Sequence, residues 1–233
     1  MRVERYRASS FTSMVATGRR RNVEVSSGVR PPFILMTTPL LFSWPYWPIF
    51  SIVWIWAFWP EFKIVRAARK PATRSDSPDA GSYRVIVYGG GLAALLGFPL
   101  AWMPILRVPV GARPAVFGVG LVLIIVGSLL RRHCQRVLGS SFTGDVRADP
   151  NQRIMTTGAY ALLRHPSYSA GILMNIGIGL ALGSWASTAL LALAAFAVYS
   201  YRIAVEERAL IRVIGEPYRD FMSKRRRLIP FIY

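Results

Sequence analysis

The chain has 233 residues, of which 53% are hydrophobic, and it carries a formal net charge of +18. A mean hydropathy of +0.35 is too apolar for an ordinary soluble domain of this length, which indicates a membrane protein. So positive a charge is also typical of nucleic-acid-binding proteins, but the sequence contains no basic stripe interleaved with aromatic residues and no known nucleic-acid motif. We therefore expect no nucleic-acid partner, and we expect the basic residues to lie beside anionic lipid headgroups.

The sequence contains one cysteine, Cys134, and two histidines. A single cysteine excludes an internal disulfide bond, so cysteine usage does not indicate the compartment. So few cysteines and histidines also predict that the chain has no dedicated metal site. We predict no cleavable signal sequence, because the first apolar run begins only at Phe33, after a basic lead.

Uncharged stretches define the predicted membrane helices. Residues 1–32 are rich in Arg, Ser and Thr and lack apolar periodicity, which predicts a disordered or surface-lying arm. Beyond this arm, four stretches contain no Asp, Glu, Lys, Arg or His: 33–59, 85–106, 114–130 and 166–201. A helix needs roughly 20 apolar residues to cross a bilayer, so each of the first three stretches predicts one crossing. The first crossing contains Pro39, Pro45 and Pro48, which predict kinks.

The last uncharged stretch has 36 residues, which is longer than one crossing requires. Gly183 and Ser184 lie near its middle and favour a turn, so this stretch predicts a helical hairpin within the membrane. The helix after the turn is expected to continue to Ile214, where Gly215 would end it.

The predicted fold is therefore an all-α, multi-pass transmembrane helical bundle of about five spans. Residues 33–138 form its N-terminal helices, and residues 139–233 form a C-terminal region with the hairpin and a tail. Five crossings place 20 of the 29 Lys and Arg residues on one side of the membrane, including those in the third loop and the tail. Because positive charge concentrates on the cytoplasmic side, we predict that this loop and tail face the cytoplasm. We interpret the basic run at 224–227 as a headgroup anchor.

Two polar clusters flank the predicted hairpin. The first is TTGAYALLRHPSYSAG at 156–171, and the second is RIAVEERALIRVIGEPYRDF at 202–221. Since the turn folds the second helix back along the first, both clusters should return to the same membrane surface. Arg202 and Glu206 lie one helical turn apart on the same face. An exposed ion pair there would contribute only ~0 to 1 kcal/mol, so the pattern predicts a functional cavity rather than a stabilising pair.

This arrangement resembles the isoprenylcysteine carboxyl methyltransferase family and its phospholipid methyltransferase relatives. The matching elements are T-G-x-Y at 157–160, RHPSY at 164–168, R-x-x-x-E-E at 202–207, L-x-x-x-x-G-E-x-Y at 210–218 and R-x-I-P at 227–230. The resemblance covers residues 139–230, and the ordered set is more specific than any one element. It implies an integral membrane S-adenosylmethionine-dependent methyltransferase that acts on a lipophilic acceptor, with carboxyl O-methylation of an isoprenylcysteine-like substrate as the expected reaction.

The resemblance also implies a cytoplasmic pocket for the cofactor S-adenosylmethionine. The positions that it assigns to cofactor binding are Gln152, Ile154, Met155, Tyr160, His165, Pro166, Ser167, Tyr168 and Glu206, and Gln152 stands where these enzymes often have His. Arg202 is implied to be catalytic and to meet the acceptor. Carboxylate, imidazole and aromatic groups suit a cationic methyl donor, and an arginine suits an acceptor carboxylate. Direct displacement from a sulfonium depends on in-line positioning and needs no enzyme nucleophile.

Two other functions stay open on the sequence. Sterol-reductase-like membrane proteins have a similar C-terminal hairpin with an R-H-P-x-Y element but use NADPH, and a non-catalytic membrane scaffold could keep the same shape. The acidic pair Glu206 and Glu207 favours the methyl donor, and the sequence has no Gly-rich loop for nucleotide phosphates. The acceptor could be a prenylcysteine carboxylate, a phospholipid amine, a thiol or another small lipophile. The expected location is the plasma or inner membrane of a bacterium, or the endoplasmic reticulum of a eukaryote.

Overall fold

The structure of the protein, a computed structural model, describes residues 38–68, 81–104, 106–139, 142 and 154–229. The elements in these ranges are η1 (Leu40–Phe42), α2 (Tyr46–Ala68), α3 (Ser82–Leu100), η2 (Val110–Ala112), α4 (Arg113–Leu138), η4 (Gly158–Ala161), α5 (Pro166–Ala181), α6 (Trp185–Ile214) and α7 (Glu216–Ser223). The predicted all-α class is therefore confirmed. The predicted arm at residues 1–32 lies outside the described residues, and the division of the chain after residue 138 stays a prediction.

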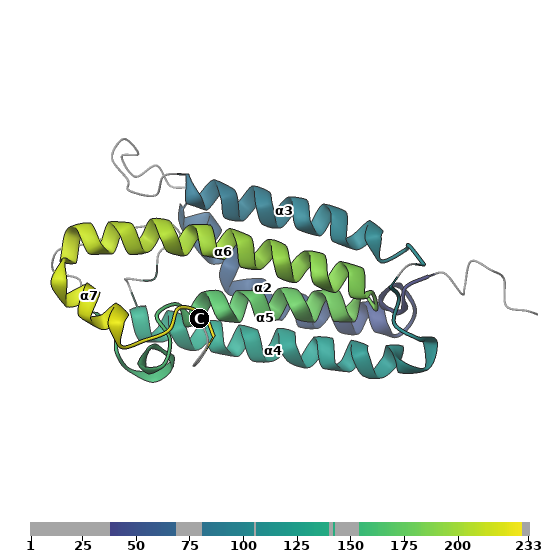
Figure 1. Cartoon of the computed structure of the whole chain (residues 1–233). Helices are drawn as coiled ribbons and strands as arrows, with labels where there is room; N and C mark the ends of the chain where they lie inside the picture. The colour runs from purple at the N-terminus through teal and green to yellow at the C-terminus, as the bar shows by residue number, and fades with distance from the viewer. Residues whose placement is uncertain (1–37, 69–80, 105, 140–141, 143–153, 230–233) are drawn as a thin grey trace, which may run out of the picture.

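The five long helices form a bundle (Figure 1). α5 packs between α4 and α6, α3 packs against α6, and α2 packs against α4. Glycines bring α4 and α5 close together: a Cβ atom added to Gly120 would lie 2.6 Å from the carbonyl oxygen of Gly177, and one added to Gly127 would lie 2.8 Å from that of Ala170. Small residues let helix backbones approach closely in membranes. This close packing fixes the position of α5, whose first turn carries several predicted site residues.

The chain reverses direction at Gly183, between α5 and α6. Gly183 has a φ of +69°, in the left-handed region that glycine adopts without a steric penalty. Ser184 then caps α6, since its side chain accepts a hydrogen bond of 3.2 Å from the backbone N–H of Ser187. α6 ends at Ile214, followed by Gly215 with a φ of +77°. The predicted hairpin and the predicted end of its second helix are both confirmed.

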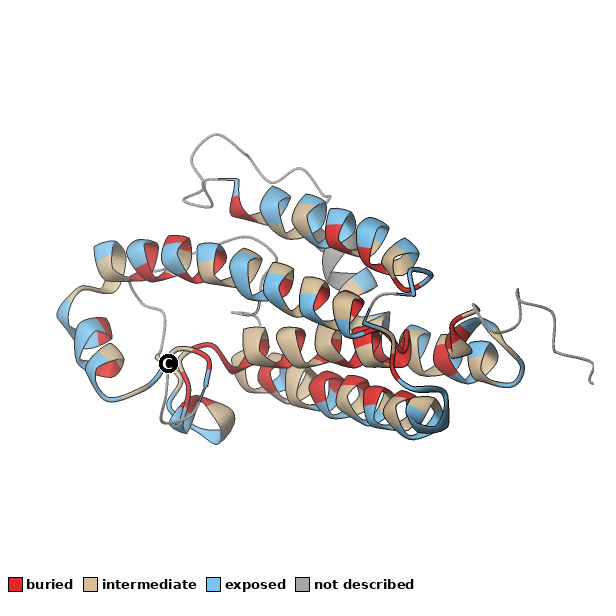
Figure 2. Cartoon of the chain, turned by 45° about the vertical axis from the view of Figure 1, so that its right-hand side comes forward, coloured by how far each residue is buried: buried red, intermediate tan, exposed pale blue. Residues whose placement is uncertain are grey.

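Several helices have the properties of membrane spans. Within the described residues, three helical segments are long and apolar enough to cross a membrane, namely Ser82–Leu100, Val110–Leu138 and Trp185–Ile214. Large apolar side chains are exposed on the outside of the bundle, among them Ile52, Leu95 and Leu193, and Figure 2 shows that exposed positions run along the outer faces of the helices. A bundle with so apolar an exterior is suited to a lipid environment. The chain is therefore an all-α membrane protein with several membrane-spanning helices.

The first long helix differs from the prediction. α2 begins only at Tyr46, so Pro39 and Pro45 precede it, and Pro48 lies in its first turn. A proline in the first turn of a helix breaks no hydrogen bond, because the first N–H groups have no partner within the helix. The predicted kinks at these three prolines are therefore wrong, and the prolines instead mark the start of the helix. α2 also continues beyond its predicted end, so that Glu61 lies within the helix.

Candidate active site

The hairpin brings its two polar ends together at one end of the bundle. His165 is the N-cap position of α5, and Pro166 follows as the first helical residue, where its fixed φ suits a helix start. His165 Nε2 lies 3.3 Å from Glu207 Oε1, and the Tyr168 hydroxyl donates a hydrogen bond of 2.7 Å to Glu206 Oε2. The predicted proximity of these two segments is therefore confirmed. We call the region formed by residues 164–168 and 202–207 the hairpin mouth.

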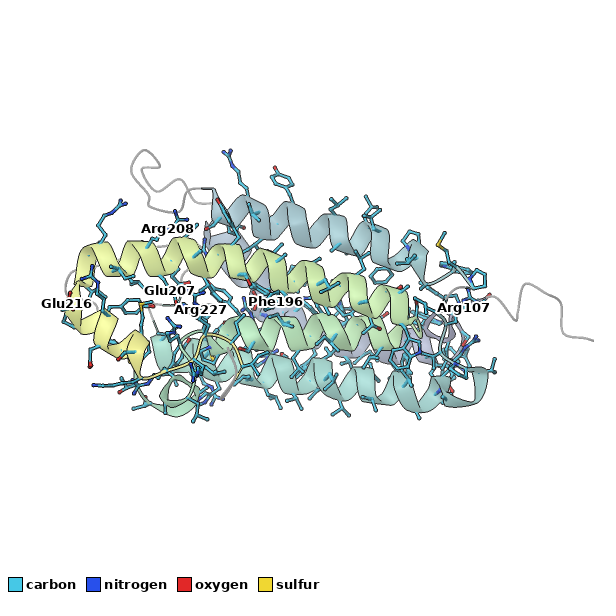
Figure 3. All side chains as sticks on the ribbon, viewed as in Figure 1. Arg107, Phe196, Glu207, Arg208, Glu216 and Arg227 are labelled. Atoms are coloured by element: carbon cyan, nitrogen blue, oxygen red, sulfur yellow. The ribbon has the colours of Figure 1, made fainter. Side chains whose placement is uncertain are left out.

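Glu207 lies at the centre of a group of cations in the hairpin mouth. Its side chain is 4% exposed. Arg164 Nη1 lies 2.7 Å from one carboxylate oxygen, and Arg227 Nη2 lies 2.9 Å from the other. Glu207 and Arg227 are labelled in Figure 3. The imidazole of His165 is a third partner of this carboxylate. A carboxylate this buried is stable only with such partners, so Glu207 joins α5, α6 and the C-terminal segment.

The C-terminal segment lies across the hairpin mouth and pairs with it through the backbone. The N–H of Arg164 donates to the carbonyl of Arg226 at 2.7 Å, and the N–H of His165 donates to that of Arg227 at 3.1 Å. The side chain of Arg227 turns inward to the Glu207 carboxylate. Arg227, the last residue of the basic run at 224–227, therefore contributes to the site, and the headgroup-anchor role of that run stays a prediction.

Glu206, next to Glu207, has different surroundings. Its side chain is 30% exposed, and His165 Nδ1 lies 4.0 Å from one of its carboxylate oxygens. Tyr168, which donates to the same carboxylate, belongs to an aromatic stack: its ring centroid lies 5.6 Å from that of His165 and 5.1 Å from that of Tyr199. Glu206 is thus a partly accessible carboxylate beside aromatic rings, whereas Glu207 is enclosed by cations.

Arg202 lies one turn before Glu206 on α6 and is buried, with 3% of its surface exposed. Its Nε lies 3.4 Å from the Tyr168 hydroxyl, and its Nη1 donates to the hydroxyl of Ser82. Ser82 is the first residue of α3 and is fully buried. The guanidinium is therefore oriented from both α5 and α3. Ser82 could not be assigned to the site from the sequence, because one serine at the start of an apolar helix carries no recognisable signal.

The predicted cofactor-binding residues before the hairpin are only partly described. Gln152 lies outside the described residues. Ile154 packs against the apolar cluster where α6 meets α7, and Met155 is half-buried. Tyr160 is buried in η4, and burial raises the pKa of its phenol above the ordinary value. Tyr160 therefore stays protonated at neutral pH and can act as a hydrogen-bond donor.

Ser167 is also buried and makes its contacts on the α4 side of the hairpin mouth. Its hydroxyl accepts a hydrogen bond of 2.8 Å from Arg131 Nη1, and its carbonyl accepts one of 3.1 Å from the same nitrogen. Arg131 is paired in turn with Glu61 of α2. Neither Arg131 nor Glu61 could be assigned to the site from the sequence, because their pairing depends on how two distant helices pack.

The fold and the site together define a membrane protein with a polar site at one end of a helical hairpin. The site combines two carboxylates, three arginines, an imidazole and stacked tyrosines. In the part of the chain that the structure describes, no group of three His, Cys, Asp or Glu side chains could hold a metal ion. The groups present suit binding of a ligand with cationic and anionic parts.

Comparison with known proteins agrees with this description. Residues 119–212 match the model of the isoprenylcysteine carboxyl methyltransferase (ICMT) family. A probable protein-S-isoprenylcysteine O-methyltransferase of Oryza sativa subsp. indica is 33% identical over 116 residues, which cover 49% of this chain and 61% of that protein. The protein-S-isoprenylcysteine O-methyltransferase of Schizosaccharomyces pombe is 32% identical over 114 residues, which cover 48% of each protein.

A solved structure is also similar. It is the structure of a eukaryotic intramembrane Ras methyltransferase ICMT, with 26% sequence identity and a TM-score of 0.51, and the match covers 61% of this chain and 52% of that one. The matched part of the chain therefore spans between about half and three fifths of these relatives. Within this chain, the family match contains the hairpin and the whole hairpin mouth, whereas α2 and α3 precede it.

Proposed function

We propose that the chain is an integral membrane S-adenosylmethionine-dependent methyltransferase that methylates the carboxylate of an isoprenylcysteine-like acceptor. One observation carries the proposal: within the segment that matches the ICMT family, the hairpin brings Glu206, Tyr168 and His165 together beside Arg202. The named relatives are protein-S-isoprenylcysteine O-methyltransferases, which favours a carboxylate over an amine or a thiol as the acceptor group.

The residues present fit S-adenosylmethionine, which supplies an activated methyl group on a sulfonium when it is bound. Glu206 is a partly exposed carboxylate, and it can attract the positive charge of the donor. The stacked rings of Tyr168 and Tyr199 offer faces that favour cations. His165, Pro166, Ser167 and Tyr160, with Gln152, Ile154 and Met155 before the hairpin, complete the proposed donor site.

Arg202 is the proposed contact for the acceptor. A guanidinium binds a carboxylate in bidentate fashion, and this geometry fixes the direction in which the carboxylate oxygen faces the methyl group. Tyr168 and Ser82 hold the guanidinium from two sides. Because the reaction is a direct displacement, such orientation of the two reactants supplies much of the acceleration.

We further infer that α2 to α6 make five crossings. α5 has 16 residues, fewer than the roughly 20 of an average span. The hairpin turn nevertheless places α5 alongside the apolar part of α6. The excess of Lys and Arg beside the hairpin mouth and in the tail favours a cytoplasmic orientation for the site. The expected location is the plasma or inner membrane of a bacterium, or the endoplasmic reticulum of a eukaryote, where a lipophilic acceptor can enter from the bilayer.

Ligand binding by the Glu206→Ala variant tests the donor site. Purified wild-type protein is expected to bind S-adenosylmethionine and not NADPH in a calorimetric titration. Glu206→Ala should weaken this binding about a hundredfold, because it removes the carboxylate that faces the cationic donor. Asp220→Asn, at an exposed position on α7, is the matched control and should bind like wild type. Binding of NADPH alone would support a reductase, and binding of neither ligand would support a scaffold.

A further inference from the structure

A bidentate ion pair links α2 to α4 close to the hairpin mouth. Arg131 Nε donates to Glu61 Oε1, and Arg131 Nη2 donates to Glu61 Oε2 at 2.8 Å. The side chains of Arg131 and Glu61 are only 15% and 24% exposed, and Gln135 Nε2 adds a third contact to Glu61 at 3.5 Å. This pair therefore differs from a solvated surface pair, whose contribution is small.

The same guanidinium also holds the start of α5. Its remaining terminal nitrogen, Nη1, donates to both the hydroxyl and the carbonyl of Ser167. Ser167 lies between His165 and Tyr168, which make the contacts to the two acids of the hairpin mouth. An arginine presents its donors in a rigid planar fork, so fixing one edge of the fork on Glu61 also fixes the nitrogen that faces Ser167.

Glu61 lies outside the part of the chain that matches the ICMT family, whereas Arg131 and Ser167 lie within it. Among the residues that the structure describes, Glu61 makes side-chain hydrogen bonds to Arg131 and Gln135 on α4, and Arg131 also contacts the hairpin mouth through Ser167. We therefore expect Glu61 to affect ligand binding through the position of Arg131 and the first turn of α5.

We propose that Arg131, held by Glu61, is a positioning residue that orients the first turn of α5 for donor binding. This inference rests on the proposed function, since the ligand whose binding it controls is S-adenosylmethionine. The alternative is a purely structural role, in which the pair only ties α2 to α4. The two roles make different predictions, because a reversed ion pair would keep the tie between the helices but would remove the donor that faces Ser167.

The charge-reversal variant Glu61→Arg/Arg131→Glu separates the two roles, with S-adenosylmethionine affinity and Tm measured on the full-length protein. We expect the reversed pair to recover most of the Tm that Arg131→Glu alone loses. The dissociation constant for S-adenosylmethionine should stay about tenfold to a hundredfold weaker than in wild type, which is the scale for loss of a charge-assisted hydrogen bond. The matched control is Asp220→Lys/Lys224→Asp, which reverses an exposed pair on α7 and should change neither quantity.

Recovery of both the Tm and the affinity by the reversed pair would overturn the positioning role and leave the proposed function intact. If the reversed pair does not fold, Glu61→Gln replaces it: this variant keeps the shape of the side chain but weakens its hold on Arg131. We expect Glu61→Gln to bind S-adenosylmethionine about tenfold more weakly, and wild-type affinity in that variant would overturn the inference. Failure of the wild-type protein to bind S-adenosylmethionine would instead overturn the proposed function and this inference together.

Discussion

The Glu207→Gln variant is expected to lose about 3 kcal/mol of folding stability. The substitution keeps the shape of the side chain but removes the negative charge that Arg164 and Arg227 share, and it also weakens the bond to His165. In this variant Arg164 and Arg227 repel each other in a largely buried site, and both lack the carboxylate that paired with them. Because these contacts join α5, α6 and the C-terminal segment, the hairpin mouth should loosen as a unit.

Thermal unfolding in detergent measures this effect. A loss of about 3 kcal/mol corresponds to a fall in Tm of roughly 6 to 12 °C for a chain of this size. Asp220→Asn provides the control, because Asp220 pairs with Lys224 in an exposed position and such pairs contribute little. An unchanged Tm in Glu207→Gln would mean that the cations around Glu207 do not hold the site together.

The Arg202→Ala variant is expected to lose turnover on the order of a hundredfold while it keeps its affinity for the methyl donor. Arg202 is the proposed holder of the acceptor carboxylate, and its loss leaves that carboxylate without a bidentate partner. Donor binding should persist, because Glu206 and the aromatic stack stay in place. Steady-state methyl transfer gives the kcat, and calorimetry gives the dissociation constant for S-adenosylmethionine.

Arg202→Lys separates orientation from charge in the same position. Lysine keeps the positive charge but lacks the planar fork, so we expect a kcat between those of wild type and Arg202→Ala. Ser82→Ala, which removes one of the groups that orient the guanidinium, should lower the kcat without weakening donor binding. Equal turnover in wild type and Arg202→Ala would remove Arg202 from the acceptor site.

The sequence predicted the hairpin because its signals are local. An uncharged stretch too long for one crossing, with Gly183 and Ser184 near its middle, allows few structures other than two helices joined by a turn. The contact of His165 with Glu206 and Glu207 follows from that turn alone. Arg202, Glu206 and Tyr168 could therefore be grouped from the sequence alone.

Other parts of the site depend on packing between distant segments. Ser82 and Arg202 are 120 residues apart, and Glu61 and Arg131 are 70 apart, so no local pattern joins them. Glu206 and Glu207 are adjacent in sequence, yet a turn of about 100° per residue along the helix directs them to different partners. The inward orientation of Arg227 likewise depends on Glu207.

Transfer of a labelled methyl group by the purified protein tests the central proposal most directly. The assay supplies methyl-labelled S-adenosylmethionine with either a prenylcysteine analogue that has a free carboxylate or an extract of membrane lipids. We predict label in the prenylcysteine product, released as methanol by mild base, because a carboxyl methyl ester is hydrolysed whereas a methylated amine is not. Base-stable label in the lipid extract alone, or no transfer to either acceptor by protein that binds the donor, would contradict the proposed carboxyl methyltransferase activity.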